Sequence, residues 1–123
     1  MNHSEVKVLI IDDEKVLLRM LRQMLAKTGF VVDIAESAVE GIEKIHNTSY
    51  DLILTDIKMP NMSGNDLFDY VKNNMKQSIP IIAMSGTPWL LENSDFDAVI
   101  AKPFHKEDLL GKVRQFIQGP ELQ

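Results

Sequence analysis

The chain has 123 residues, of which 45% are hydrophobic and 25% charged, and it carries a formal net charge of −5 and no cysteine. These values are typical of one soluble globular domain, and they exclude disulfides and thiolate metal sites. No block of Lys or Arg and no apolar run of membrane-spanning length is present, so direct binding to nucleic acid or insertion into a membrane is not expected.

The first half of the chain alternates between predicted strands and helices. Residues 6–12 form a short β-branched apolar run, which predicts a buried strand. Residues 14–28 predict a helix whose buried stripe is formed by Val16, Leu17, Met20, Leu21, Met24 and Leu25. Residues 31–35 predict a second strand. Ser37 and Glu40 have the spacing of a capping box, and they predict the start of a helix that carries Val39, Ile42 and Ile45.

The second half continues this alternation. Residues 51–56 predict a third strand, and a loop that begins at Pro60 leads to a helix with Leu67, Phe68, Val71 and Met75. Residues 79–85 and 97–102 predict the fourth and fifth strands. The last helix is expected to stop at Gly119–Pro120, and its apolar face consists of Leu109, Leu110, Val113, Phe116 and Ile117.

This order of elements predicts the fold class. Continuous apolar strands separated by amphipathic helices indicate a parallel sheet that is covered on both faces. Right-handed crossovers then give a doubly wound α/β fold. The order expected for its five strands is 2-1-3-4-5, that of flavodoxin-like folds. We expect a single domain over residues 1–123, with its core from about 5 to 118.

Polar side chains stand where the predicted strands end. Asp12 and Asp13 close the first strand, Asp56 the third, Ser85 the fourth and Lys102 the fifth. In a parallel sheet these ends share one edge, and strands one and three meet at the switch point where such folds place their sites. Three carboxylates in one crevice repel each other, so a hard cation such as Mg²⁺ is the expected partner. The set fits phosphoryl transfer onto a carboxylate.

Simpler interpretations of these residues exist. Asp12 and Asp13 could be an N-cap pair for the helix that follows, and Ser85 with Gly86 also has the composition of a turn. Lys102 could be an ordinary surface residue. For Trp89 the simplest interpretation is packing over the end of the sheet. The three histidines lack metal-ligand spacing and are expected to be surface or capping residues: His3, His46 and His105.

Four segments resemble the motifs of a known family: "LIIDDE", "LILTDIKMPNMSG", "IIAMSG" and "AKPF", in this order. Over nearly its whole length the chain resembles the receiver domain of a two-component response regulator, in the CheY-like superfamily. The resemblance implies that Asp56 accepts a phosphoryl group. It also implies that Mg²⁺, with Mn²⁺ as an alternative ion, is bound by Asp13, Asp56 and the backbone carbonyl of Lys58, while Asp12 acts largely through a bound water.

The resemblance extends to the remaining site residues and to the partners. Ser85 would donate a hydrogen bond to a phosphoryl oxygen, Lys102 would pair with the phosphoryl group or with Asp56, and the Lys102–Pro103 bond would be cis. The donor would be a phosphohistidine on a sensor histidine kinase or on a histidine phosphotransfer protein. A cytoplasmic domain is expected, as a monomer or a phosphorylation-dependent dimer that controls an output domain or protein. It would catalyse only its own phosphorylation and dephosphorylation.

Two positions depart from the family pattern. Ser85 and Lys102 are 17 positions apart, about one helical turn fewer than usual. Only a short fourth helix, near residues 89–93, then fits between the last two strands, and Pro88 suits its first position. Val99 stands where the family usually has Tyr or Phe. We therefore expect an altered readout surface, with signalling through another face or through Trp89 and its loop.

Three alternatives remain open from the sequence. A pseudo-receiver would bind partners independently of phosphorylation, and the departures above favour it. A phosphohydrolase of the aspartyl-phosphate type usually has a second acid near the nucleophile, whereas this chain has Lys58 two positions after Asp56. A flavin-binding protein would need a phosphate-binding loop after the first strand. The chain could act alone or be part of a larger regulator or hybrid kinase.

Overall fold

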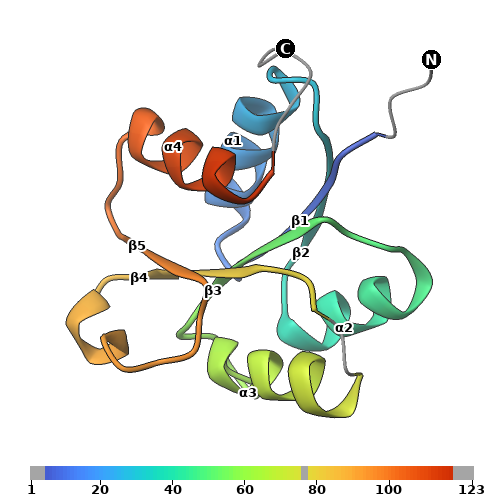
Figure 1. Cartoon of the computed structure of the whole chain (residues 1–123), viewed down its shortest axis with the longest axis vertical. Coiled ribbons are helices and arrows are strands. Elements are labelled where there is room, and N and C mark those ends of the chain that lie inside the picture. The colour runs from blue at the N-terminus through green and yellow to red at the C-terminus, as the bar shows by residue number, and fades with distance from the viewer. Residues whose placement is uncertain (1–4, 76–77, 118–123) are drawn as a thin grey trace.

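A computed structural model of the chain describes residues 5–75 and 78–117. The strands form one parallel sheet in the order β2-β1-β3-β4-β5 (Figure 1). The predicted doubly wound fold and strand order are therefore confirmed. The strand bounds are β1 (Lys7–Ile11), β2 (Val31–Ala35), β3 (Leu52–Asp56), β4 (Ile81–Ser85) and β5 (Ala98–Ala101).

Helices cover both faces of the sheet. In Figure 1, α1 and α4 lie on one side of it, and α2 and α3 lie on the other. Their bounds, with those of two short elements, are α1 (Lys15–Ala26), α2 (Ala38–Asn47), α3 (Gly64–Asp69), η1 (Tyr70–Asn74), η2 (Pro88–Leu91) and α4 (Lys106–Phe116). The predicted stop at Gly119–Pro120 lies outside the described residues. No helix within 5–75 and 78–117 is long and apolar enough to cross a membrane.

The core has two layers, one on each face of the sheet. Val8 and Ile10 of β1 belong to the layer under α1 and α4, whereas Leu9 and Ile11 belong to the layer under α2 and α3. All five residues of β3 are buried. Because both faces are covered, a polar side chain on a central strand reaches solvent only at a strand end. This restriction explains why the carboxylates Asp12 and Asp56 stand at the ends of β1 and β3 and not within them.

The buried face of α1 differs from the predicted stripe. Leu18, Leu21 and Leu25 are buried, but Val16 is 75% exposed and Met20 is 50% exposed. The helix turns a three-leucine face with the spacing i, i+3 and i+7 toward the sheet, so the flanks of the wide apolar stripe stay in solvent. Val39, which was expected to mark the buried face of α2, is likewise 55% exposed.

Serine side chains cap the starts of α2 and α3. Ser37 Oγ accepts a hydrogen bond from Glu40 N at 3.1 Å, as predicted, but Glu40 Oε1 accepts from Glu36 N at 2.7 Å instead of from Ser37 N. A complete capping box occurs at Ser63 and Asp66, which was not predicted. It fixes the start of α3 directly after the loop that leaves Asp56.

The predicted third helix is composite. It begins as α3 and continues as the π-helical turn η1, in which Val71 is buried. The periodicity of apolar residues does not distinguish these two helix types over one turn, so the change was not predicted.

The segment between β4 and β5 is a single 3₁₀ turn, Pro88–Leu91, with Pro88 in its first turn as predicted. In a 3₁₀ turn the side chains at i and i+3 lie on one side, so Leu91 shares the side of Pro88 and is buried. Trp89 is 62% exposed. The expectation that Trp89 packs over the end of the sheet is therefore wrong, and Leu91 is the buried residue of this turn.

Candidate functional site

The predicted polar residues meet at the carboxyl edge of the sheet. Asp12 directly follows β1, Asp56 and Ser85 are the last residues of β3 and β4, and Lys102 directly follows β5. Asp12 is fully buried, Asp56 is 8% exposed and Ser85 is 5% exposed. In the part of the chain that is described, every buried side-chain nitrogen or oxygen has a hydrogen-bond partner. The site is thus a hydrogen-bonded network and not a set of isolated charges.

Three carboxylates form its acidic cluster. Asp12, Asp13 and Asp56 each offer an oxygen, and these atoms lie within 4.8 Å of one another. Asp13 is exposed, so the cluster opens to solvent on its side. Convergent carboxylate oxygens with access to water are the donor set that suits Mg²⁺. Asp12 Oδ1 also accepts a hydrogen bond from Glu14 N, at the N-cap of α1, at 2.9 Å. The Asp12 carboxylate therefore contacts the start of α1 and is also part of the acidic cluster.

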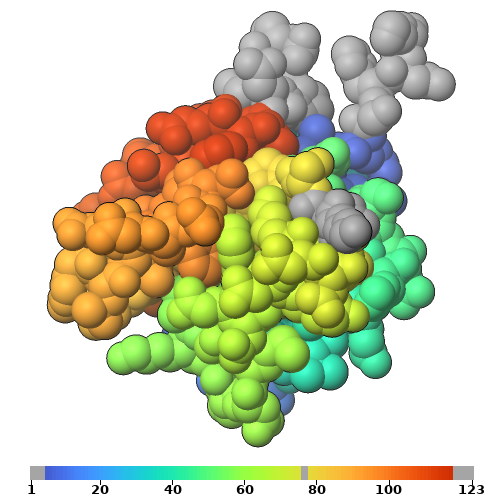
Figure 2. Space-filling view, turned by 60° about the horizontal axis from the view of Figure 1, so that its bottom comes forward, coloured from blue at the N-terminus to red at the C-terminus, as the bar shows by residue number. Residues whose placement is uncertain are grey.

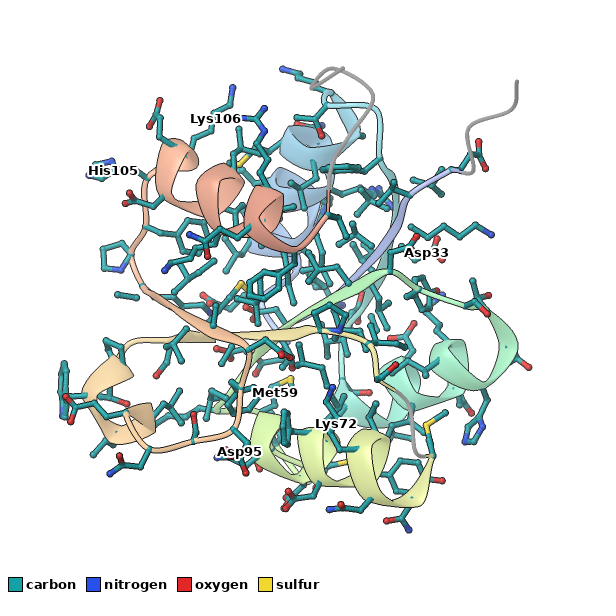
Figure 3. The ribbon with its side chains drawn as sticks, in the orientation of Figure 1. Asp33, Met59, Lys72, Asp95, His105 and Lys106 are labelled. Carbon is teal, nitrogen blue, oxygen red and sulfur yellow. The ribbon has the colours of Figure 1, made fainter. Side chains whose placement is uncertain are left out.

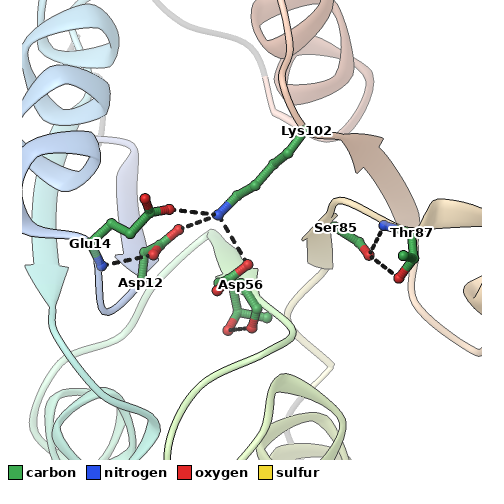
Figure 4. A network of polar contacts seen from close by, with 7 residues as sticks. Asp12, Glu14, Asp56, Ser85, Thr87 and Lys102 are labelled. Carbon is green, nitrogen blue, oxygen red and sulfur yellow. Dashed lines mark hydrogen bonds and ion pairs between the residues drawn. The ribbon is translucent and has the colours of Figure 1, made fainter.

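Lys102 joins the cluster from the other side (Figure 4). Its Nζ lies 2.8 Å from Asp12 Oδ2 and 3.0 Å from Asp56 Oδ1. A third carboxylate, that of Glu14, has its Oε1 3.5 Å from Lys102 Nζ. This contact was not predicted, although the position of Glu14 directly after Asp12 and Asp13 pointed to it. Because the Glu14 side chain is 66% exposed, water screens this contact. The Lys102–Pro103 bond is cis, as the resemblance implied.

Burial and charge act in opposite directions on these groups. Burial raises the pKa of the Asp56 carboxyl, and the negative charge of Asp12 raises it further, against the opposing effect of Lys102. Burial alone would lower the pKa of Lys102, but its hydrogen bonds to Asp12 and Asp56 outweigh burial, so the net shift is upward. One ammonium therefore does not fully compensate the carboxylates. A divalent cation in the cluster would relieve the excess negative charge.

Ser85 is turned toward its own loop. Its Oγ accepts a hydrogen bond from Thr87 N at 3.0 Å and lies 3.4 Å from Thr87 Oγ1. Figure 4 shows this pair apart from the network of Lys102. These contacts agree with the simpler interpretation of Ser85 as a turn residue. Because Ser85 Oγ accepts the bond from Thr87 N, this bond does not use the hydroxyl hydrogen, which can be donated to another group.

The other singled-out residues lie around this edge or away from it. Lys58 is exposed in the loop after β3, and Met59 packs partly buried against the α2 and α3 layer. His46 is exposed and meets the Tyr70 ring edge-on at 6.3 Å. His105 is exposed at the N-cap of α4, where its side chain makes no capping bond. The predicted place of His3 lies outside the described residues.

The family model of the response regulator receiver domain matches residues 8–114 of this chain. The chain belongs to this family. Receiver domains bind Mg²⁺ in an acidic pocket and act in two-component signalling, where histidine kinases and output domains are their partners. The predicted family and the two-component context are confirmed, and the structure brings Asp12, Asp13 and Asp56 together in an acidic cluster.

Individual relatives agree with this membership. The chain is 32% identical over 118 residues to protein PilG of Pseudomonas aeruginosa, covering 91% of this chain and 87% of PilG. It is 35% identical over 115 residues to response regulator ArlR of Staphylococcus saprophyticus, covering 91% of this chain and 52% of ArlR. This receiver domain thus spans about half the length of ArlR.

One solved structure with this fold is a complex with Mg²⁺ and BeF. The Thermotoga maritima response regulator TrrA, in complex with Mg²⁺ and BeF, superposes with a TM-score of 0.82 at 26% identity, over 91% of this chain and 99% of TrrA.

Proposed function

We propose that this receiver domain is a switch controlled by phosphorylation of Asp56. The phosphoryl donor is a phosphohistidine on a sensor histidine kinase or histidine phosphotransfer protein, and an output domain or protein reads the change. One observation carries the proposal: the Asp56 carboxylate ends β3 beside an acidic pair and within 3.0 Å of the Lys102 ammonium. The cytoplasmic location expected from the sequence remains part of this proposal.

The residues present can support the transfer. An oxygen of Asp56 attacks phosphorus, so an O–P bond forms as the N–P bond of the phosphohistidine breaks, and the electron pair goes to the imidazole nitrogen, which takes up a proton. Lys102, already 3.0 Å from Asp56 Oδ1, would donate to a phosphoryl oxygen as negative charge gathers there. Asp13 and Asp56 with the Lys58 carbonyl, and Asp12 through a water, would hold Mg²⁺. When bound, Mg²⁺ would neutralise charge on the phosphoryl oxygens.

The site acts on its own side chain and not on a separate substrate. Water would later hydrolyse the aspartyl phosphate and restore Asp56. In the phosphorylated state, the Ser85 hydroxyl would donate to a phosphoryl oxygen, and its bond from Thr87 N would link the site to the loop that leads into η2. A pseudo-receiver is the second candidate, because Val99 offers no ring to follow such a movement of Ser85.

The decisive experiment is the intact mass of the protein after incubation with acetyl phosphate, with and without Mg²⁺. The wild type should gain one phosphoryl group only when Mg²⁺ is present, and Asp56→Asn should gain none. Asp69→Asn is the matched control, because Asp69 is an exposed aspartate on α3 away from the acidic cluster, and it should behave as the wild type.

The possible results separate the two candidates. An adduct that needs both Mg²⁺ and Asp56 supports the switch. No adduct on a folded wild type calls for a second measurement, since a small donor can fail where a kinase succeeds. In that case, absence of stabilisation by Mg²⁺ with beryllofluoride, a phosphoryl mimic, would overturn the switch in favour of the pseudo-receiver.

A further inference from the structure

Glu14 is a charged residue of the site that the transfer to Asp56 does not use. It occupies the N-cap position of α1, but its side chain makes no capping hydrogen bond, and glutamate is not among the residues preferred at an N-cap. Its Oε1 lies 3.5 Å from Lys102 Nζ, and its side chain is 66% exposed. Such an exposed contact is weak. The Glu14 carboxylate is therefore available to a molecule that approaches the site.

A largely apolar cavity opens beside this carboxylate. Its volume is about 290 Å³, near the lower end of the range for small-molecule sites. It is lined by Glu14, Leu17, Met20, Lys102, Pro103 and Phe104. Of these six residues, only Glu14 and Lys102 are charged, and Lys106, the next cation along the chain, points away from the sheet at the start of α4 (Figure 3). A ring with one polar edge suits this wall better than a small anion does.

Negative charge exceeds positive charge at this edge of the sheet. The acidic cluster and Glu14 supply four carboxylates, whereas Lys58 and Lys102 supply two ammonium groups. Lys102 is already shared by three of these carboxylates. Lys15, the neighbour of Glu14 on α1, lies 3.8 Å from Glu36 instead. Within the residues that the structure describes, Glu14 makes one ion pair, with Lys102, so its negative charge acts on whatever binds next to that ammonium.

A phosphoryl group in transfer would lie next to Glu14. Lys102 Nζ lies 3.0 Å from Asp56 Oδ1 and 3.5 Å from Glu14 Oε1, so both carboxylates contact the same ammonium. Figure 4 shows them on different sides of it. When Lys102 donates to a phosphoryl oxygen, the departing group of the donor is close to Glu14 as well. The charge that this group carries then decides whether Glu14 assists or opposes the transfer.

We propose that Glu14 selects the phosphodonor by the charge of its leaving group: it favours a phosphorylated imidazole and disfavours an acyl phosphate. In both reactions an oxygen of Asp56 forms the new O–P bond. With a phosphoimidazole the N–P bond breaks, and the ring nitrogen keeps the electron pair and takes up a proton from water, so no anion leaves. With acetyl phosphate the O–P bond breaks and acetate leaves with a negative charge, which the Glu14 carboxylate repels.

The imidazole ring matches the cavity wall. Its carbon edge suits Leu17 and Phe104, and its nitrogen edge, which gains positive charge with the proton, suits the carboxylate of Glu14. The inference rests on the proposed phosphorylation of Asp56 and adds the class of donor to it. Glu14 thereby ties phosphorylation to a phosphohistidine partner and limits phosphorylation by free acyl phosphates.

The test compares the rates at which the full chain gains one phosphoryl group from monophosphoimidazole and from acetyl phosphate, measured by intact mass at saturating Mg²⁺ and low salt. In Glu14→Gln the rate with acetyl phosphate should rise about threefold and the rate with monophosphoimidazole should fall about threefold, as expected for one exposed charge. Both changes should shrink at high salt. The ratio of the two rates is the readout, because a loss of stability or of Mg²⁺ binding would move both rates in the same direction.

Two further variants serve as controls. Glu43→Gln removes the same charge from an exposed position on α2 and should leave the ratio unchanged. In Figure 2 α2, in turquoise, lies at the right of the molecule, apart from the red helix α4 at the upper left. Glu14→Asp keeps a carboxylate at the N-cap and should give a ratio closer to that of the wild type than Glu14→Gln does. Circular dichroism of each variant checks that the fold is intact.

The outcomes separate this inference from the proposed function. An unchanged ratio in Glu14→Gln, with phosphorylation intact, would overturn the inference alone. An equal change in Glu43→Gln would overturn it too, because the net charge of the chain and not Glu14 would then set the preference. If the wild type gains no phosphoryl group even from monophosphoimidazole, the inference is wrong, and the measurement with beryllofluoride then decides whether the proposed function fails as well.

Discussion

Gly64 lies so close to the backbone of Asp56 that one added methyl group should destabilise the domain. A Cβ on Gly64 would clash with the carbonyl oxygen of Asp56 and lie 3.0 Å from Ile57 Cα. Both obstacles are backbone atoms, so no side chain can turn away. The Gly64 N–H also donates to Ile57 O at 2.9 Å, which ties α3 to the loop after β3. Gly64→Ala must therefore shift the loop, the helix or both.

Forcing extra volume into a packed site costs about 1–3 kcal/mol. For a chain of this size that corresponds to a fall of roughly 4–12 °C in the melting temperature. Urea unfolding followed by circular dichroism should give a lower midpoint with an unchanged slope, since the mutation does not alter the surface exposed on unfolding. The rate of phosphorylation from acetyl phosphate should fall as well, because the displaced backbone carries Asp56.

Gly111→Ala is the matched control. Gly111 is exposed on α4, and a Cβ there would meet no atom within 4 Å. Replacing a glycine by alanine in an open helix position stabilises by about 0.5–1 kcal/mol. The two alanine variants should therefore move in opposite directions. If Gly64→Ala is as stable as the wild type, or if both variants gain stability, the close approach of α3 to Asp56 does not constrain the domain and the reasoning is wrong.

Three further predictions concern charge and hydrogen bonding. Mg²⁺ should raise the free energy of unfolding, by about 1.4 kcal/mol at ten times its dissociation constant. Asp13→Asn should weaken this stabilisation. If the stabilisation is undiminished in this variant, Asp13 is not a ligand of the metal. Because the pKa of Asp56 is raised on folding, its stabilising contribution is present below its ordinary pKa and is lost as pH rises through the folded value. Without Mg²⁺, Asp56→Asn should thus be more stable than the wild type at neutral pH, with the difference vanishing in acid, as measured by urea unfolding at a series of pH values. The hydroxyl of Tyr50 donates to Asp33 Oδ2 at 2.6 Å, so Tyr50→Phe should lose about 1 kcal/mol. Burial and this bond raise the pKa of Tyr50, so the loss should be constant below pH of about 10, the ordinary tyrosine pKa, and shrink above it.

The sequence was sufficient for the fold and for the place of the site. The strands are buried on both faces, so their composition alone separates them from the amphipathic helices, and the polar residues at the ends of β1, β3, β4 and β5 mark the open edge. Asp12, Asp56 and Lys102 converge because parallel strands share that edge. This geometry follows from topology and needs no knowledge of side-chain packing.

The features that the sequence did not predict depend on how a helix is rotated about its axis and on the local conformation of a loop. Val16 and Met20 are apolar and at helical spacing, yet the orientation of α1 leaves them in solvent. A stripe that is wider than the buried face cannot show which of its edges is covered. The prediction for Trp89 was wrong for a related reason. Which side chains of a single 3₁₀ turn face the sheet depends on the residue at which the turn starts. The bond between Ser85 and Thr87 depends on the path of the loop, which short-range spacing does not fix.

The ion pair between Asp12 and Lys102 joins residues 90 positions apart. Synthesis begins at the N-terminus, so all three aspartates of the cluster have been synthesised once Asp56 has been added. Lys102 follows 46 residues later in the sequence. A nascent chain therefore contains Asp56 before it contains the ammonium of Lys102 that pairs with it. Only when β5 takes its place at the edge of the sheet does Lys102 reach the cluster. The complete ion-pair network thus depends on the completed fold, because a chain that lacks β5 and the residue after it lacks the ammonium that contacts both Asp12 and Asp56.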